Sequence, residues 1–399
     1  MPSESVIPIA SQAASRQFAR RLSFFYGTLF GLLGTHLPFF PVWLRAIGLD
    51  ASWIGIIIAV PAVTRFTVLP VVTSFAERRH ALRGALRLTA FAAALGFAVV
   101  GSQHRPILVF LVYVATCCLW TPMVPLTDAY ALRGVMRYGL DYGRLRLWGS
   151  AAFVAGALVC GLLVDVIAAS ELIWIIVGLA VLGAAASLAL QPLDNPRAGA
   201  ATVHGESAAL RPLGFLATIV AAALIQGSHA AYYTFASITW QAQGLSGLTI
   251  AGLWTLGVLA EILVFAASPR FTLPTVMMVV IGGLSAAARW FVTAQEPPLA
   301  LLAAVQLAHG LSFGLTQVGT MGLLVRQVPA HAMARGQGYY AACSGIVASS
   351  TSVVSGIVYA HYGQRVYYVM AAMAASGAVL MWSARRQFES HPHSAASGG

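Results

Sequence analysis

Long runs of apolar residues, separated by short polar segments, repeat along the whole chain of 399 residues. A helix needs about 20 mostly apolar residues to cross the roughly 30 Å hydrocarbon core of a bilayer. The runs of that length lie near residues 22–46, 52–76, 85–103, 106–132, 145–168, 171–190, 213–242, 247–268, 276–294, 298–325, 334–361 and 365–385. The pattern therefore predicts an all-α membrane protein with twelve transmembrane helices.

A polar stretch divides these runs into six and six. Residues 191–211 are the least apolar segment between the first and last runs, and they predict a cytoplasmic central loop. On either side we expect a six-helix bundle, one over residues 1–190 and one over residues 212–386. The polar residues 387–399 predict a disordered cytoplasmic tail.

A weak internal echo relates the two predicted bundles. Gly48 opens the link to the second span and is followed 17 residues later by Arg65. Gly244 opens the link to the eighth span and is followed by Glu261 at the same interval. Many secondary transporters are built from duplicated bundles. The echo favours two pseudo-symmetric halves of that kind.

The composition excludes soluble and disordered proteins. Hydrophobic residues make up 59% of the chain and charged residues only 9%, whereas a soluble domain carries about 25% charged residues. Disordered chains are poor in apolar and aromatic residues. The four cysteines lie inside apolar runs, which argues against a disulfide framework.

The net charge of +11 comes entirely from arginine, because the chain contains no lysine. The arginines form small groups between the apolar runs, which argues against a nucleic-acid interface. With the N-terminus inside, 18 arginines fall in cytoplasmic segments and 3 in outer loops. This asymmetry predicts that both termini are cytoplasmic. We expect a multi-pass protein of a bacterial inner membrane whose first span is retained rather than cleaved as a signal peptide.

The candidates for charged side chains within the membrane are Arg65, Asp128, Glu261 and Arg289. A charge in mid-membrane costs roughly 2.5–3.5 kcal/mol on insertion scales. These residues either join helices together or face a water-filled cavity. Desolvation of an ion pair can exceed its Coulombic gain, so charges are poor at joining helices. We therefore favour a functional role.

Three of the polar residues in the second half are expected at similar depth. At 1.5 Å per residue, His309 falls near the midplane, with Glu261 and Arg289 on either side of it. A low-dielectric site favours the protonated form of a carboxylic acid, so Glu261 is the first candidate for a proton site. His309 relays protons, hydrogen-bonds substrate or simply packs. His36 and His229 are interpreted as packing residues.

The most specific stretch of sequence runs from Trp120 to Phe153. Asp128 lies toward the inner end of the fourth span, and Arg146 begins the fifth. An arginine beside a carboxylate on the adjacent helix can present a planar fork of donors to substrate oxygens. Alternatively, Arg146 is an ordinary cytoplasmic arginine at a span end. Phe153 lies two turns further along the helix and would supply an apolar wall.

Several segments resemble the major facilitator superfamily. Tyr142-Gly-Arg-Leu-Arg-Leu-Trp-Gly and Leu37-Pro-Phe-Phe-Pro-Val-Trp-Leu are similar to its oligosaccharide:proton symporters. A closer similarity, to its 3-phenylpropionate permeases, includes Pro125-Leu-Thr-Asp-Ala, Gln226-Gly-Ser-His-Ala-Ala-Tyr-Tyr and Leu256-Gly-Val-Leu-Ala-Glu. The resemblance covers nearly the whole chain. It implies the twelve-helix facilitator fold and a transport function.

The resemblance also implies roles for single residues. In the sugar symporters, the residues matching Asp128 and Arg146 bind substrate, and the aromatic residue matching Phe153 stacks on it. The residues matching Arg289 and His309 belong to the proton-coupling machinery. One departure is clear, because those symporters have a glutamate one turn beyond the histidine, where this chain has Ser312 and its neighbour Phe313. A second is the loop between spans 2 and 3, which retains little of the superfamily's motif.

These observations predict a proton-coupled symporter that imports a small organic solute by alternating access. An aromatic carboxylate is the favoured substrate; sugars and nucleosides are the alternatives, and a proton-driven drug exporter is a second transport hypothesis. Two alternatives of another class are a membrane-embedded enzyme and a non-transporting receptor on a carrier fold. The enzyme would need clustered polar residues at one interface. The receptor would show no uptake. We expect no enzymatic activity, no cofactor or metal, and a monomer in the bilayer. The candidate substrate-binding residues are Asp128, Arg146, Phe153, Arg65 and His309, and those for proton coupling are Glu261, Arg289 and His309.

Overall fold

The computed structural model describes residues 12–78, 81–193, 213–329 and 332–389. Within these residues every regular element is a helix. Most of the predicted central loop and the last ten residues of the predicted tail lie outside the described residues. The start of the tail continues the short helix α16 (Arg386–Glu389).

Contacts between Cα atoms divide the chain into two compact units. Unit 1 comprises residues 1–47 and 67–199, and unit 2 comprises residues 48–66 and 200–399. This division differs from a simple cut at the central loop, because the first part of α2 (Ala51–Arg78) groups with the second half of the chain. The predicted bundle boundaries remain a prediction.

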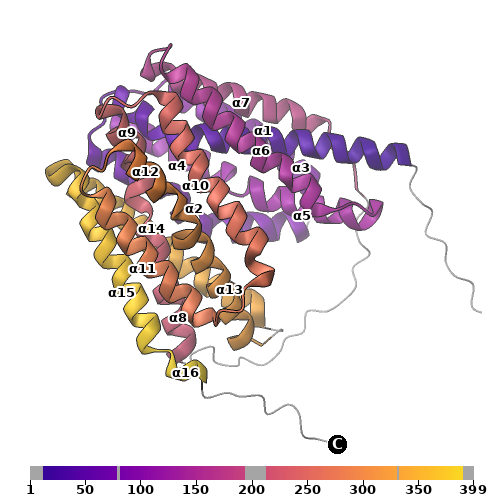
Figure 1. Ribbon diagram of the computed structural model, residues 1–399. Helices are drawn as coiled ribbons and strands as arrows, with labels where there is room; N and C mark the ends of the chain where they lie inside the picture. Colours follow the sequence, from indigo (N-terminus) through magenta and orange to yellow (C-terminus); the bar gives the residue numbers. More distant parts are fainter. Residues whose placement is uncertain (1–11, 79–80, 194–212, 330–331, 390–399) are drawn as a thin grey trace, which may run out of the picture. The chain divides into compact units, whose positions relative to one another are not determined.

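Unit 1 contains the helices of the first half, coloured indigo to magenta in Figure 1. After α1 and the second part of α2, they are α3 (Leu82–Gly101), α4 (Pro106–Trp120), α5 (Met123–Tyr138), α6 (Tyr142–Val164), η1 (Ala169–Glu171) and α7 (Leu172–Leu188). The first, α1 (Gln12–Ala46), packs along α6 and α7. It therefore forms the centre of the unit.

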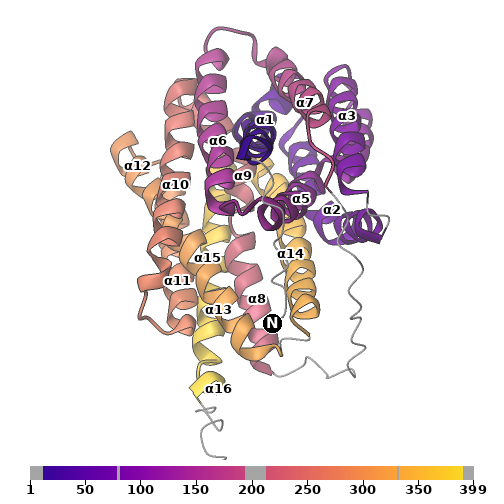
Figure 2. The same cartoon turned by 90° about the vertical axis from the view of Figure 1, so that its right-hand side faces the viewer.

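Unit 2 contains the helices of the second half, together with the first part of α2. They are α8 (Leu213–Gly227), α9 (Ala230–Ala242), α10 (Gly247–Ala267), η2 (Ser268–Arg270), α11 (Thr275–Thr293), α12 (Leu299–Leu307), the π-helix η3 (Gly310–Leu315), α13 (Thr316–Gln327), α14 (Met333–Tyr362), η5 (Gly363–Arg365), α15 (Val366–Ser383) and α16. In Figure 2, α8, α11 and α15 lie side by side, and α15 packs against both of the others.

Eleven helical stretches of the described residues are long and apolar enough to cross a membrane. The last of them, Arg335–Ser383, holds two helices, α14 and α15, joined at η5. Each of the twelve predicted spans therefore has a helical counterpart, and the predicted all-α membrane fold is confirmed.

Three of these spans are interrupted. The break between α4 and α5 falls at Pro122, which has no backbone N–H to continue the helix. The break between α8 and α9 falls at Ser228, whose hydroxyl donates to the carbonyl of Ile225 at 2.6 Å. The last of the three interrupted spans, which begins with α12, changes to a π-helix after His309. A π-helix inside an α-helix is frequent at functional sites, and this one follows the candidate residue His309.

The internal echo in the sequence has a counterpart in the backbone. Gly48 and Gly244 have φ angles of +91° and +82°, a conformation that favours glycine. Two residues after each glycine, a side chain caps the following helix: Asp50 accepts from the Trp53 N–H, and Ser246 accepts from the Thr249 N–H. The same turn thus precedes both α2 and α10, as expected of duplicated halves.

The helices α1 and α6 approach closely because glycines face each other across their contact. A Cβ atom at Gly34 would overlap the backbone carbonyl of Phe153, and one at Gly156 would overlap the carbonyl of Gly31. Small residues allow this approach between membrane helices. The contact sets the position of α6, which carries Arg146.

Replacing Gly34 by alanine is expected to destabilise unit 1. The added methyl group meets rigid backbone, so the two helices must separate, and overpacking of this kind costs about 1–3 kcal/mol. Thermal unfolding in detergent measures the effect. Gly178→Ala is the control, because a Cβ atom added there would meet nothing within 4 Å. Equal unfolding temperatures for the two variants would contradict this account of the α1–α6 contact.

Candidate functional site

Unit 1 places a carboxylate between two phenols. The hydroxyl of Tyr26, on α1, donates to Oδ1 of Asp128, on α5, at 2.6 Å. The hydroxyl of Tyr142, at the start of α6, donates to the same oxygen at 3.0 Å. Arg146 lies one turn further along α6, and its Nε is 4.0 Å from that oxygen. Three helices therefore converge on one carboxylate oxygen.

The guanidinium of Arg146 is held by an aromatic ring. Its Cζ lies 3.8 Å from the centroid of Phe30 and 5.7 Å from that of Tyr26. Gly149 leaves the space for it, since a Cβ there would come within 2.9 Å of both the guanidinium and the Phe30 ring. The side chain of Arg146 is 29% exposed and that of Asp128 32%. This group can therefore meet a polar ligand.

Phe153 lies on α6, two turns beyond Arg146. It is partly buried, and its carbonyl faces Gly34 on α1. In the part of the chain that the structure describes, no ring-stacking or cation–π contact joins Phe153 to Arg146, and Phe30 has that contact instead. The spacing of Tyr26 and Phe30, one turn apart on the first span, is the sequence signal that would have found both.

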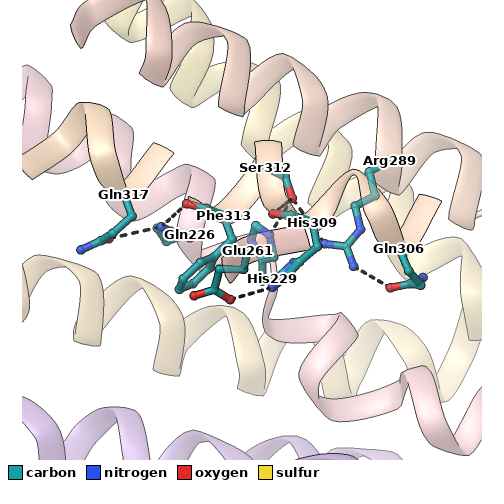
Figure 3. A network of polar contacts seen from close by, with 9 residues as sticks. All are labelled: Gln226, His229, Glu261, Arg289, Gln306, His309, Ser312, Phe313 and Gln317. Carbon is teal, nitrogen blue, oxygen red and sulfur yellow. Dashed lines mark hydrogen bonds and ion pairs between the residues drawn. The ribbon is translucent and has the colours of Figure 1, made fainter. Parts of the chain in front are cut away.

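Unit 2 arranges four polar side chains in a row, drawn in Figure 3. Oε2 of Glu261, on α10, lies 3.6 Å from Nε2 of His309, at the start of η3. Nδ1 of His309 lies 2.8 Å from Nη1 of Arg289, on α11. Nη2 of Arg289 donates to Oε1 of Gln306, on α12, at 2.8 Å. Glu261, His309 and Arg289, expected at similar depth, thus form one connected network.

The direction of these contacts defines the state of His309. A guanidinium has donors and no acceptor, so Nδ1 of His309 accepts from Arg289. The neutral imidazole then carries its proton on Nε2, which faces Glu261. His309 therefore lies between Glu261 and Arg289 and faces them with different ring nitrogens.

Burial changes sharply along the row. Arg289 is 2% exposed and Gln306 1% exposed, whereas the side chain of Glu261 is 25% exposed. The guanidinium of Arg289 also lies 4.6 Å from the ring centroid of Tyr232 and 4.3 Å from that of Trp290. Glu261 is therefore the partly exposed end of the row, and Arg289 is the enclosed end.

The carboxylate nearest His309 comes from another helix and not from the turn that follows the histidine. Ser312 takes the position one turn beyond His309, and its hydroxyl lies 3.4 Å from Nη1 of Arg289. The carboxylate next to His309 comes instead from Glu261 on α10. Gly310 and Gly314 allow α10 to approach η3, since a Cβ at Gly310 would lie 2.5 Å from the carbonyl of Ala260.

His36 and His229, interpreted above as packing residues, are both buried. His36 contacts the hydroxyl of Tyr113 at 3.0 Å and stacks on Phe40, as expected of a packing residue. His229 is 0% exposed and stands at the break between α8 and α9, where its Nε2 lies 3.3 Å from the Ser312 hydroxyl. His229 therefore packs and also joins the Arg289 network. The contact of His229 with Ser312 was not predicted from the sequence. Neither was the role of Gln306, which lies one turn before His309.

Arg65 lies on the part of α2 that belongs to unit 2, and its side chain is exposed. It interacts electrostatically with Tyr233, which also interacts with Glu261 and Arg289. Across the described ranges, His/Cys/Asp/Glu residues do not cluster in a way that would hold a metal ion.

Residues 19–370 match the family model described as "MFS_1 like family". The chain belongs to this family of the major facilitator superfamily. This MFS transporter is 31% identical over 369 residues to the probable 3-phenylpropionic acid transporter of Escherichia coli (strain K12), across 90% of this chain and 96% of that protein. It is 29% identical over 300 residues to the maltose permease of Geobacillus stearothermophilus, across 73% of this chain and 75% of the permease.

Solved structures agree with this assignment. The crystal structure of a point mutant of the nucleoside transporter NupG matches 92% of this chain and 99% of its own, with a TM-score of 0.81 at 15% identity. At that identity the likeness shows the fold. The expected facilitator fold and family are confirmed, and the MFS protein is a multi-pass membrane transporter rather than an enzyme.

Proposed function

We propose that this MFS transporter is a proton-coupled symporter that imports an aromatic carboxylate, such as 3-phenylpropionate, by alternating access. The substrate class is inferred from the surroundings of Arg146. Its Cζ lies 3.8 Å from the ring centroid of Phe30, and its Nε lies 4.0 Å from Oδ1 of Asp128. At 4.0 Å from Asp128, the guanidinium has N–H donors available for a substrate carboxylate. The Phe30 ring beside it can contact the aromatic ring of the substrate. The 31% identity to a probable 3-phenylpropionic acid transporter supports the same class.

We assign proton coupling to the row of polar side chains that begins at Glu261 and continues through His309 to Arg289. Glu261 is partly exposed and lies 3.6 Å from His309, which in turn contacts the buried Arg289. Protonation of Glu261 removes the charge that faces Nε2 of His309 and so changes the electrostatic surroundings of Arg289. A change of this kind is suited to biasing a two-state carrier. The proton gradient supplies the energy, and the proposal needs no cofactor and no second copy of the chain.

Purified protein in proteoliposomes tests the proposal. Adding 3-phenylpropionate outside should drive proton entry into the vesicles and uphill accumulation of the acid when an inward proton gradient is applied. An exporter driven by protons would give no substrate-induced proton influx, and a receptor would give no uptake. Either result would refute the symporter.

A sugar or nucleoside symporter is the second candidate. It is favoured by the maltose permease relative and by Asp128, whose partly exposed carboxylate can accept hydrogen bonds from hydroxyl groups. A thermal-shift comparison of aromatic acids, sugars and nucleosides separates the two candidates. Stabilisation by sugars alone would favour the second.

We also propose that the transporter lies in a bacterial inner membrane with both termini in the cytoplasm. The support is the excess of arginine in alternate loops. Alkaline phosphatase fused after the last residue should be inactive, and green fluorescent protein fused there should fluoresce. The opposite pair of results would reverse the topology.

A further inference from the structure

We propose that Tyr26 and Tyr142 hold Asp128 apart from Arg146 and thereby select an anionic substrate. The inference rests on the proposed function, and it makes the two tyrosines positioning residues that act through Asp128. Both tyrosines, the carboxylate and the arginine belong to unit 1.

The two phenols and the arginine compete for one atom. Tyr26 and Tyr142 both donate to Oδ1 of Asp128, at 2.6 and 3.0 Å, and a carboxylate oxygen offers about two lone-pair positions. Nε of Arg146 is 4.0 Å from that same oxygen, whereas a direct hydrogen bond between arginine and a carboxylate is about 2.7–2.9 Å long. The phenols therefore take the positions that the arginine would otherwise use.

The same helix that supplies one phenol also holds the arginine. Tyr26 is 0% exposed on α1, and Phe30 follows one turn later with its ring against the guanidinium of Arg146. Tyr26 therefore fixes the carboxylate while Phe30 fixes the cation. Because Tyr26 and Phe30 are one turn apart, they keep Asp128 and Arg146 close together without a direct hydrogen bond between them.

This arrangement affects anions and neutral ligands differently. If Asp128 closed on Arg146, a substrate carboxylate would have to displace an internal carboxylate before binding. With the phenols in place, the donors of Arg146 are available, and part of the charge of Asp128 is compensated by two hydrogen bonds. A neutral ligand of the same shape gains little from either effect. Removing the phenols should therefore weaken anion binding selectively.

The test compares a carboxylate with its neutral isostere. Binding of 3-phenylpropionate and 3-phenylpropionamide is measured by calorimetry for the wild-type protein, Tyr26→Phe, Tyr142→Phe and the double variant. We expect the double variant to bind the carboxylate about tenfold more weakly, the equivalent of one lost hydrogen bond to a charged group. Binding of the amide should change little. Tyr130→Phe is the matched control, since Tyr130 lies on α5 and donates to the backbone of Gln191 at 2.7 Å.

A second background tests whether the tyrosines act through Asp128. In an Asp128→Asn protein no internal anion competes for Arg146, so Tyr26→Phe should leave carboxylate binding unchanged. An equal loss in both backgrounds would show that Tyr26 contacts substrate or only supports packing, and it would overturn the inference.

The two possible failures differ in their outcome. If the wild type binds 3-phenylpropionate and the double variant binds it equally well, the inference is wrong and the proposed function stands. If the wild type binds no aromatic carboxylate, or prefers the amide, the proposed function itself is wrong.

Discussion

Replacing Arg146 by alanine is expected to abolish binding of 3-phenylpropionate while the protein still inserts and folds. The guanidinium offers two parallel donors to a carboxylate, and a hydrogen bond to a charged group contributes about 1.5–3 kcal/mol. Loss of both should raise the dissociation constant at least about a hundredfold. Calorimetry on purified protein measures binding, and size-exclusion chromatography in detergent checks folding.

Arg144→Ala is the control for this variant. Arg144 is two residues earlier on α6, its side chain is 88% exposed, and it lies 3.8 Å from Asp141 as a surface ion pair. Its removal should leave affinity unchanged, because exposed ion pairs contribute little. Wild-type affinity in Arg146→Ala would remove this residue from the substrate site.

Replacing Glu261 by glutamine is expected to uncouple transport from protons. Glutamine keeps the size of the side chain and can still contact His309, but it carries no exchangeable carboxyl proton. Accumulation against a gradient should disappear, while exchange of labelled for unlabelled substrate across the membrane continues. Proteoliposomes with and without an imposed pH gradient distinguish these two activities.

Glu171→Gln provides the matched control, because Glu171 is an exposed carboxylate on η1 of unit 1. That variant should accumulate substrate as the wild type does. Undiminished accumulation by Glu261→Gln at several pH values would exclude Glu261 from the coupling mechanism.

The two variants separate the functions of the two units. Arg146 belongs to unit 1 and Glu261 to unit 2. The first change should remove substrate binding and therefore every mode of transport. The second should remove only the dependence on protons. Equal loss of binding in both variants would contradict this separation of roles.

Much of the fold was predictable from the sequence. The length of an apolar run is a local property, and a bilayer requires a helix wherever such a run crosses it, because its backbone groups find no water there. The free-energy cost of a charge in the membrane likewise identified Asp128, Glu261 and Arg289 as candidates, since such charges are rarely retained without a function. The depth estimate brought Glu261, His309 and Arg289 together because helical rise is uniform.

The partners of these residues depended on the tertiary structure. Which side chains meet is decided by how far each helix is rotated about its axis, and hydropathy does not report that rotation. The sequence thus placed Asp128 near Arg146, whereas packing of α1 brought Tyr26 and Phe30 to them.

The chain by itself determined a twelve-span membrane protein and the few charges that its interior must accommodate. The tertiary structure alone decided how those charges are partnered. The π-helix after His309 adds a residue to its turn and so changes which side chains face α10 and α11. In this turn, which the pattern of apolar residues does not reveal, Ser312 contacts both Arg289 and His229, and Glu261 is the carboxylate beside His309.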